Sequence, residues 1–152
     1  MKDLREGGFL IAKIHQITNR IFKQMLKEYG IKELNPGQGR ILFALWQNDG
    51  IPIRELSAKT QLTKSTLTTM LDRLENTGFL KREYDKDDTR LKRVTLSKKS
   101  IELQQKYADV SKKMTEVFYG SLTEEEIDEF EDFLRRILEN LIKTGDLKNK
   151  ST

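Results

Sequence analysis

The sequence contains no cysteine and a single histidine, His15, and these two shortages exclude several kinds of active site. Without cysteine there can be no disulfide framework, no cysteine-ligated zinc, no thiol nucleophile and no thiol redox sensor. A metal site with several histidines is also impossible, and a catalytic triad would have to be built around His15. We therefore expect no enzyme activity, no metal site and no cofactor.

Long apolar runs are also missing. The longest extend from Phe9 to Ala12 and from Ile41 to Trp46, far short of the roughly 20 residues that span a bilayer. The first residues, MKDLREGGF, place charged side chains and glycines where a signal peptide needs an apolar core. We expect a cytoplasmic protein with no membrane partner, and 152 residues correspond to about one domain.

The charge of the chain is nearly balanced overall but unevenly distributed. Residues 53–100 contain 12 Lys and Arg against 7 Asp and Glu, a net charge of +5. Residues 123–142 contain 2 Arg against 8 Asp and Glu, a net charge of −6. A basic middle segment favours contact with a polyanion, but solvated charged faces explain the same pattern. Charge alone leaves both interpretations open.

Apolar spacing predicts long helices at both ends of the chain. Residues 9–29 carry apolar side chains four, three and four positions apart, which is typical of one helix face. Residues 97–119 and 124–143 form two more predicted helices. Thr123 and Glu126 make a capping box at the start of the second of these.

The middle of the chain has the spacing of a helix-turn-helix motif. A helix over residues 36–48 precedes two short helices that are joined by a tight connection near residues 60–63. Thr63 is a good N-cap for the second short helix, and Gly78 is a stop signal at its end. Its inner stripe is formed by Leu67, Met70, Leu71 and Leu74.

Residues 79–96 leave the helical period and contain two strand-like runs around a polar cluster at residues 85–89. A β-hairpin directly after a helix-turn-helix is a wing. The predicted fold is mainly α, with a winged helix-turn-helix domain that carries a small β-hairpin wing and is flanked by long terminal helices. We predict an N-terminal dimerisation helix in 1–34, the winged domain in 35–96 (recognition helix 63–77, wing 79–96), C-terminal dimerisation helices in 97–144 and a disordered tail in 145–152.

The outward face of the second helix of this motif carries short hydroxyls and cations. A helix in the major groove must approach base edges and donate hydrogen bonds to phosphates, and this face meets both needs. A merely solvated face would carry more glutamate and fewer Ser and Thr residues. We expect DNA contacts from Lys64, Ser65, Thr68, Thr69 and Arg73.

The wing adds a second set of cations. An arginine at a hairpin tip can enter a narrow minor groove, and we expect Arg90 to do so. Asp88 lies two residues earlier and is expected to orient the Arg90 guanidinium by a charge-assisted hydrogen bond. Protection of an exposed strand edge is the other explanation of a basic hairpin. The further cations of the wing are Lys81, Arg82, Lys86, Lys92 and Arg93, of which we expect Lys92 and Arg93 to contact DNA.

The terminal helices carry more apolar surface than a small DNA-reading domain can cover. The last helix has a seam with apolar residues three and four positions apart, and the first helix repeats the pattern. A second copy of the chain is the simplest cover, and an intrachain three-helix bundle is the alternative. We expect dimerisation through Leu10, Ile14, Ile17, Ile127, Phe130, Leu134, Ile137 and Leu141.

The sequence resembles the MarR family of winged-helix transcription regulators over nearly its whole length. The resemblance is carried by GIKELNPGQGRILFAL, by LTKSTLTTMLDRLENTGFLKREYDKDDTRLKRVTLS and by the long flanking helices. Asp88, Arg90 and Val94 look like the family's wing signature. The resemblance implies a homodimer that reads a pseudo-palindromic operator in double-stranded DNA, usually as a repressor, and it places Thr66 with the residues at the major groove.

The resemblance also implies a small, often aromatic or anionic effector that lowers DNA affinity. The family's effector crevice lies between the dimerisation helices and the DNA-reading domain, which makes His15, Phe43, Trp46 and Tyr107 candidates for its aromatic walls and a proton donor. For each of them, core packing or a surface position is the favoured interpretation, since aromatic residues at helical spacing usually pack. The absence of cysteine excludes effector sensing through a thiol.

Two other functions compete with DNA binding. A winged helix can bind an acidic protein instead of DNA, and the basic segment does not exclude that interpretation. A hydrolase that uses the acids of residues 124–132 is disfavoured, because a solvated acidic run with no histidine nearby is typical of a surface.

Overall fold

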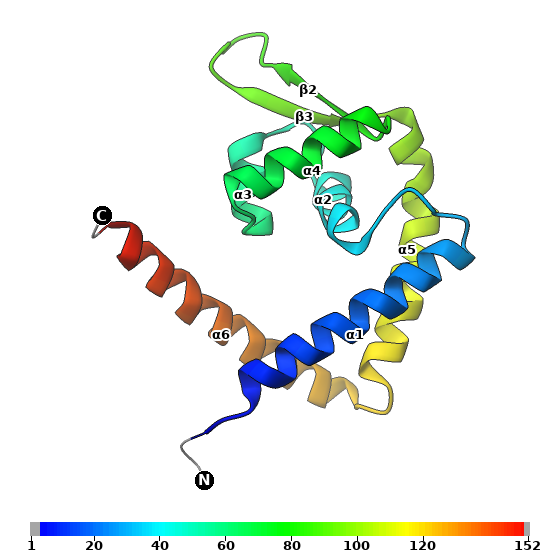
Figure 1. Ribbon diagram of the computed structural model, residues 1–152, viewed down its shortest axis with the longest axis vertical. Helices are drawn as coiled ribbons and strands as arrows, with labels where there is room; N and C mark the ends of the chain where they lie inside the picture. The colour runs from blue at the N-terminus through cyan, green and yellow to red at the C-terminus, as the bar shows by residue number, and fades with distance from the viewer. Residues whose placement is uncertain (1–3, 151–152) are drawn as a thin grey trace. The chain divides into compact units, whose positions relative to one another are not determined.

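The computed structural model describes residues 4–150, with side chains as far as Gly145. It has two compact units, one extending to Met114 and the other beginning at Thr115. The elements, labelled in Figure 1, are α1 (Gly7–Glu28), α2 (Pro36–Gln47), β1 (Ile51–Pro52), α3 (Ile53–Thr60), α4 (Lys64–Asn76), β2 (Leu80–Tyr84), β3 (Lys92–Leu96), α5 (Lys98–Tyr119) and α6 (Glu124–Lys150). The predicted mainly helical fold with a winged helix-turn-helix is confirmed.

The wing is a three-stranded antiparallel sheet in the order β1-β3-β2, not a two-stranded hairpin alone. In its register Leu80 pairs with Leu96 and Tyr84 pairs with Lys92, while Ile51 of β1 pairs with Val94. The sequence prediction missed β1, because a two-residue strand that contains a proline has no period of its own. Figure 1 shows β2 and β3 projecting together from the helices of the first unit.

Local capping signals fix the ends of the helix-turn-helix. The Thr63 hydroxyl accepts a hydrogen bond from the Thr66 amide at 3.3 Å, as an N-cap should. Gly78 ends α4 with a φ of 81°, a left-handed conformation that glycine adopts without a Cβ clash. The backbone N–H of Phe79 then donates to the carbonyl of Leu74 at 2.8 Å and turns the chain into β2.

The inner stripe of α4 forms part of one apolar core in the first unit. Leu67, Leu71 and Leu74 are each at most 1% exposed. Val94 of β3 and Phe79 at the wing's base belong to the same buried cluster. Burial of this stripe fixes which face of α4 points outward.

The second unit contains the end of α5 and the helix α6. The predicted capping box is present, because the Thr123 amide donates to the Glu126 carboxylate at 2.9 Å and the Glu126 amide to the Thr123 hydroxyl at 3.2 Å. The helix continues past Gly145 to Lys150, where the sequence predicted a disordered tail, and residues 151–152 lie outside the described part. Within the described residues, no helix is long and apolar enough to cross a bilayer.

Candidate nucleic-acid interface

The outer face of α4 is open to solvent along its length. Its buried leucines recur every three or four residues, so the residues between them point outward. The side chains predicted to meet the major groove are all exposed and lie within one helix: Lys64, Ser65, Thr66, Thr68, Thr69 and Arg73.

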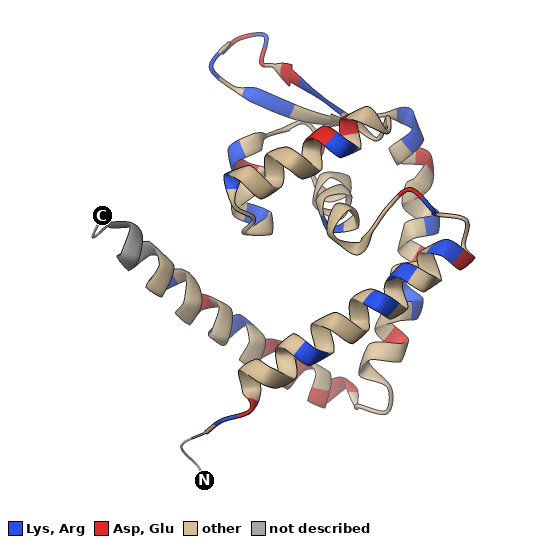
Figure 2. Cartoon of the chain, in the orientation of Figure 1, with Lys and Arg blue, Asp and Glu red and all other residues tan. Residues whose placement is uncertain are grey.

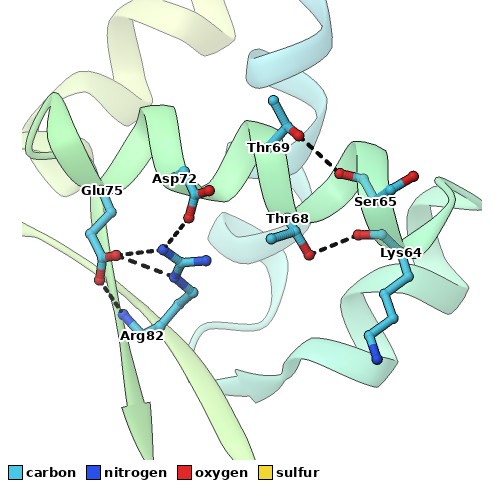
Figure 3. A network of polar contacts seen from close by, with 7 residues as sticks. All are labelled: Lys64, Ser65, Thr68, Thr69, Asp72, Glu75 and Arg82. Atoms are coloured by element: carbon cyan, nitrogen blue, oxygen red, sulfur yellow. Dashed lines mark hydrogen bonds and ion pairs between the residues drawn. The ribbon is translucent and has the colours of Figure 1, made fainter.

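The threonine hydroxyls on this face are oriented by their own helix (Figure 3). Thr68 Oγ1 donates to the Lys64 carbonyl at 2.8 Å, and Thr69 Oγ1 donates to the Ser65 carbonyl at 3.0 Å. Each hydroxyl hydrogen is thereby used, so the oxygens offer their lone pairs outward. Such acceptors match the amino groups of adenine and cytosine in the major groove, whereas Lys64 supplies a donor.

Arg82 of β2 links the wing to the C-terminal half of α4. Its guanidinium donates to the Asp72 carboxylate at 2.6 Å and to the Glu75 carboxylate at 2.7 Å, and its backbone N–H donates to Glu75 at 3.0 Å. These hydrogen bonds lower the pKa of Glu75 and raise the pKa of Arg82. The sequence analysis listed Arg82 among the cations of the wing and did not find its partners, because they lie seven and ten residues away on another element.

Arg90 stands at the end of the wing with 89% of its side chain exposed. Its Nε and Nη2 donate to the two carboxylate oxygens of Asp88 at 3.0 and 3.3 Å, which are the contacts that the sequence led us to expect. The hydrogen bonds from the Arg90 guanidinium and backbone N–H lower the pKa of Asp88. A DNA contact by Arg90 remains a prediction.

The other two predicted wing cations differ from each other. Lys92 is exposed, with its Nζ 5.2 Å from the centre of the Tyr84 ring. Arg93 donates to the Asp85 carboxylate at 2.5 Å and to the Gly50 carbonyl at 2.9 Å, so it fastens the wing loop to the turn before β1. These contacts favour a structural role for Arg93 within the wing. The hydrogen bond from Arg93 also lowers the pKa of Asp85. Figure 2 shows the Lys and Arg residues along the hairpin.

The candidate effector residues are only partly brought together. Phe43 and Trp46 line a hollow of about 100 Å³ beside Tyr107, and Trp46 is held by a hydrogen bond to the Ser100 carbonyl at 3.0 Å. Phe43 also lines a larger hollow of about 420 Å³. His15 lines neither of these two hollows. Its Nε2 lies 3.2 Å from the side-chain Nδ2 of Asn19.

The predicted dimerisation residues form apolar stripes on α1 and on α6. On α1 the stripe is 40–47% exposed, and on α6 the end of the stripe is 43–64% exposed. The exposed residues are Leu10, Ile14, Ile17, Ile137 and Leu141, and the half-buried ones are Ile127, Phe130 and Leu134.

Residues 34–92, which span α2 to the start of β3, match the sequence profile of the MarR family. This winged helix-turn-helix segment belongs to the MarR family. Curated relatives that match this chain are named transcriptional regulators, which agrees with the expectation of no enzyme activity.

Two curated relatives show how far the similarity extends along the chain. The regulator TtmR of Methylorubrum extorquens strain PA1 is 29% identical over 98 residues, which cover 64% of this chain and 49% of TtmR. The regulator HosA of Escherichia coli O157:H7 is 28% identical over 126 residues, which cover 82% of this chain and 93% of HosA. The chain thus spans about half the length of TtmR but nearly all of HosA.

Solved structures share the fold at lower sequence identity. A mutant MarR from E. coli, complexed with operator DNA, has a TM-score of 0.77 at 24% identity and covers 86% of this chain and 92% of that one. The PcaV regulator of Streptomyces coelicolor, in complex with its natural ligand, has a TM-score of 0.76 at 22% identity and covers 90% of this chain and 96% of that one. These likenesses establish the MarR-type fold.

Proposed function

We propose that this chain is a homodimeric transcriptional repressor that reads a pseudo-palindromic operator, with α4 in the major groove and Arg90 in the minor groove. The observation that carries the proposal is the exposed face of α4, where oriented hydroxyls lie between Lys64 and Arg73, beside a wing that ends in an exposed arginine. A module that binds an acidic protein has no need of hydroxyls fixed as outward acceptors.

The exposed apolar stripes and the geometry of DNA support the proposed dimer. A single winged helix contacts only a few base pairs, whereas two recognition helices about one helical turn apart read successive major grooves on one side of the duplex. The exposed residues of α1 and α6 supply apolar surface for such an association. The operator complex of the similar E. coli MarR structure supports DNA as the partner.

A small aromatic or anionic effector is the second part of the proposal. The hollow of about 420 Å³ combines the cations Arg40 and Lys59 with the apolar side chains of Phe43, Leu62 and Met70. Pockets that bind small organic ligands have this mixture of apolar walls and a few polar groups. The similar PcaV structure holds its natural ligand, and native mass spectrometry of the purified protein tests for a bound small anion here.

Selection of bound duplexes from a random pool at about 150 mM salt tests the proposed function, because most non-specific binding is weak under that condition. We expect a palindromic consensus with half-sites about one helical turn apart. An absence of enrichment, together with capture of an acidic protein by the same surface, would instead support the protein-interaction module.

Arg90→Ala is expected to weaken binding of the dimer to the selected duplex at least about 30-fold, since each of the two protomers loses a groove contact of roughly 1–3 kcal/mol. The slope of log affinity against log salt should fall by about one unit for each protomer. Fluorescence anisotropy at several salt concentrations measures both quantities. Arg135→Ala, which removes the same charge from α6, is the control, and equal losses in the two variants would contradict the role of Arg90.

A further inference from the structure

The recognition helix carries as much negative as positive charge. Lys64 and Arg73 are balanced within α4 by Asp72 and Glu75, so the helix alone has no net positive charge. Asp72 is 54% exposed and lies one position before Arg73, on the outward part of the helix. A carboxylate at this position repels the phosphates that a recognition helix must approach.

Arg82 offsets this charge from the neighbouring strand. Figure 3 shows its guanidinium between the two carboxylates, with Nη2 bonded to Asp72 and to Glu75 and Nε bonded to Glu75 at 3.2 Å. Its side chain is only 17% exposed, whereas those of Asp72 and Glu75 are 54% and 35% exposed. The guanidinium of Arg82 is therefore less exposed to solvent than the two carboxylates that it pairs with.

We infer that Arg82 is a positioning residue for DNA binding, which neutralises Asp72 and Glu75 so that the C-terminal half of α4 can approach the phosphate backbone. The inference rests on the proposed function. Ion pairs with exposed carboxylates contribute little to stability, so the main consequence of Arg82 is expected in DNA affinity rather than in folding. The hydrogen bond from the Arg82 backbone N–H to the Glu75 carboxylate holds β2 beside α4, which keeps the guanidinium next to the two carboxylates.

The test uses the full-length protein, a selected duplex and a scrambled duplex of equal length. Arg82→Gln is expected to weaken binding to both duplexes about tenfold at about 100 mM salt, because two carboxylates then face phosphates without compensation. The triple variant Arg82→Gln, Asp72→Asn, Glu75→Gln should regain most of the affinity for the scrambled duplex. Lys81→Gln is the matched control, because it removes the same charge from the same strand, where Lys81 pairs with Glu83 and not with α4.

Thermal unfolding of every variant separates affinity from folding. A melting temperature of Arg82→Gln within a few degrees of wild type is the expected result, and Arg82→Lys, which keeps the charge, should retain most of the affinity. Wild-type affinity in Arg82→Gln, an equal loss in Lys81→Gln, or no recovery in the triple variant would each overturn the inference. Failure of the wild-type chain to bind any duplex would instead overturn the proposed function on which the inference rests.

Discussion

Replacing Ile137 and Leu141 with glutamate is expected to give a folded monomer that binds the selected duplex more than about 100-fold more weakly. The two side chains lie four residues apart on α6 and are 43% and 64% exposed, so their replacement leaves the core of the first unit intact. Buried glutamates in an apolar interface lose hydration without gaining a partner, which disfavours association. A monomer reads one half-site at a time and loses the roughly 10²–10⁴-fold advantage of linked binding.

Light scattering after size exclusion gives the oligomeric state, and anisotropy gives the affinity. Lys143→Glu is the matched control, because it changes the net charge by the same two units at an exposed position of the same helix outside the predicted seam. We expect this control to remain a dimer with unchanged operator binding. A double variant that stays dimeric would show that the α6 stripe is not the interface.

The helices of the DNA-reading domain could be predicted because their signals are local. The cap at Thr63, the stripe of Leu67, Leu71 and Leu74, and the stop at Gly78 all act within a few residues of the helix that they define. The Asp88–Arg90 hydrogen bond is equally local, since the partners lie two positions apart. The predicted outward face of α4 therefore matches the structure residue by residue.

Features that depend on distant partners could not be predicted. The strand β1 forms because Ile51 pairs with Val94, which lies far along the chain. The two residues Ile51 and Pro52 are too short a segment to predict that pairing. Arg93 was predicted to contact DNA, and its hydrogen bond to the Gly50 carbonyl, 43 residues away in the chain, could not be foreseen. The ion pairs of Arg82 were missed for the same reason, because its partners Asp72 and Glu75 lie on α4, ten and seven residues earlier in the chain.

Gly39 is a further residue whose role only the structure reveals. It lies buried inside α2, where glycine is normally less favourable than alanine by about 1 kcal/mol. A Cβ atom at this position would lie 2.8 Å from Cε2 and Cζ of Tyr107 on α5 and closer still to its hydroxyl. The Tyr107 ring is only 4% exposed and packs on Phe22 and Trp46, with centroid distances of 5.7 and 5.0 Å, so it has little room to move.

Gly39→Ala is therefore expected to destabilise the protein by about 3 kcal/mol, the upper range for overpacking a core, despite the better helix propensity of alanine. In a chain of this size that loss lowers the melting temperature by roughly 6–12 °C, which differential scanning calorimetry measures. Neither Gly37→Ala nor Gly50→Ala is a suitable control. A Cβ at Gly37 would lie 2.7 Å from the end of the Met70 side chain, and Gly50 has a left-handed backbone conformation that strains any other residue.

A second substitution, Tyr107→Leu, removes the aromatic ring and serves better as the control. If overpacking is the cause, Gly39→Ala should be much less costly in the Tyr107→Leu background than in the wild type, because the atoms that the new Cβ would meet are gone. Equal costs in the two backgrounds would show that α2 needs Gly39 for some reason other than the close approach of α5.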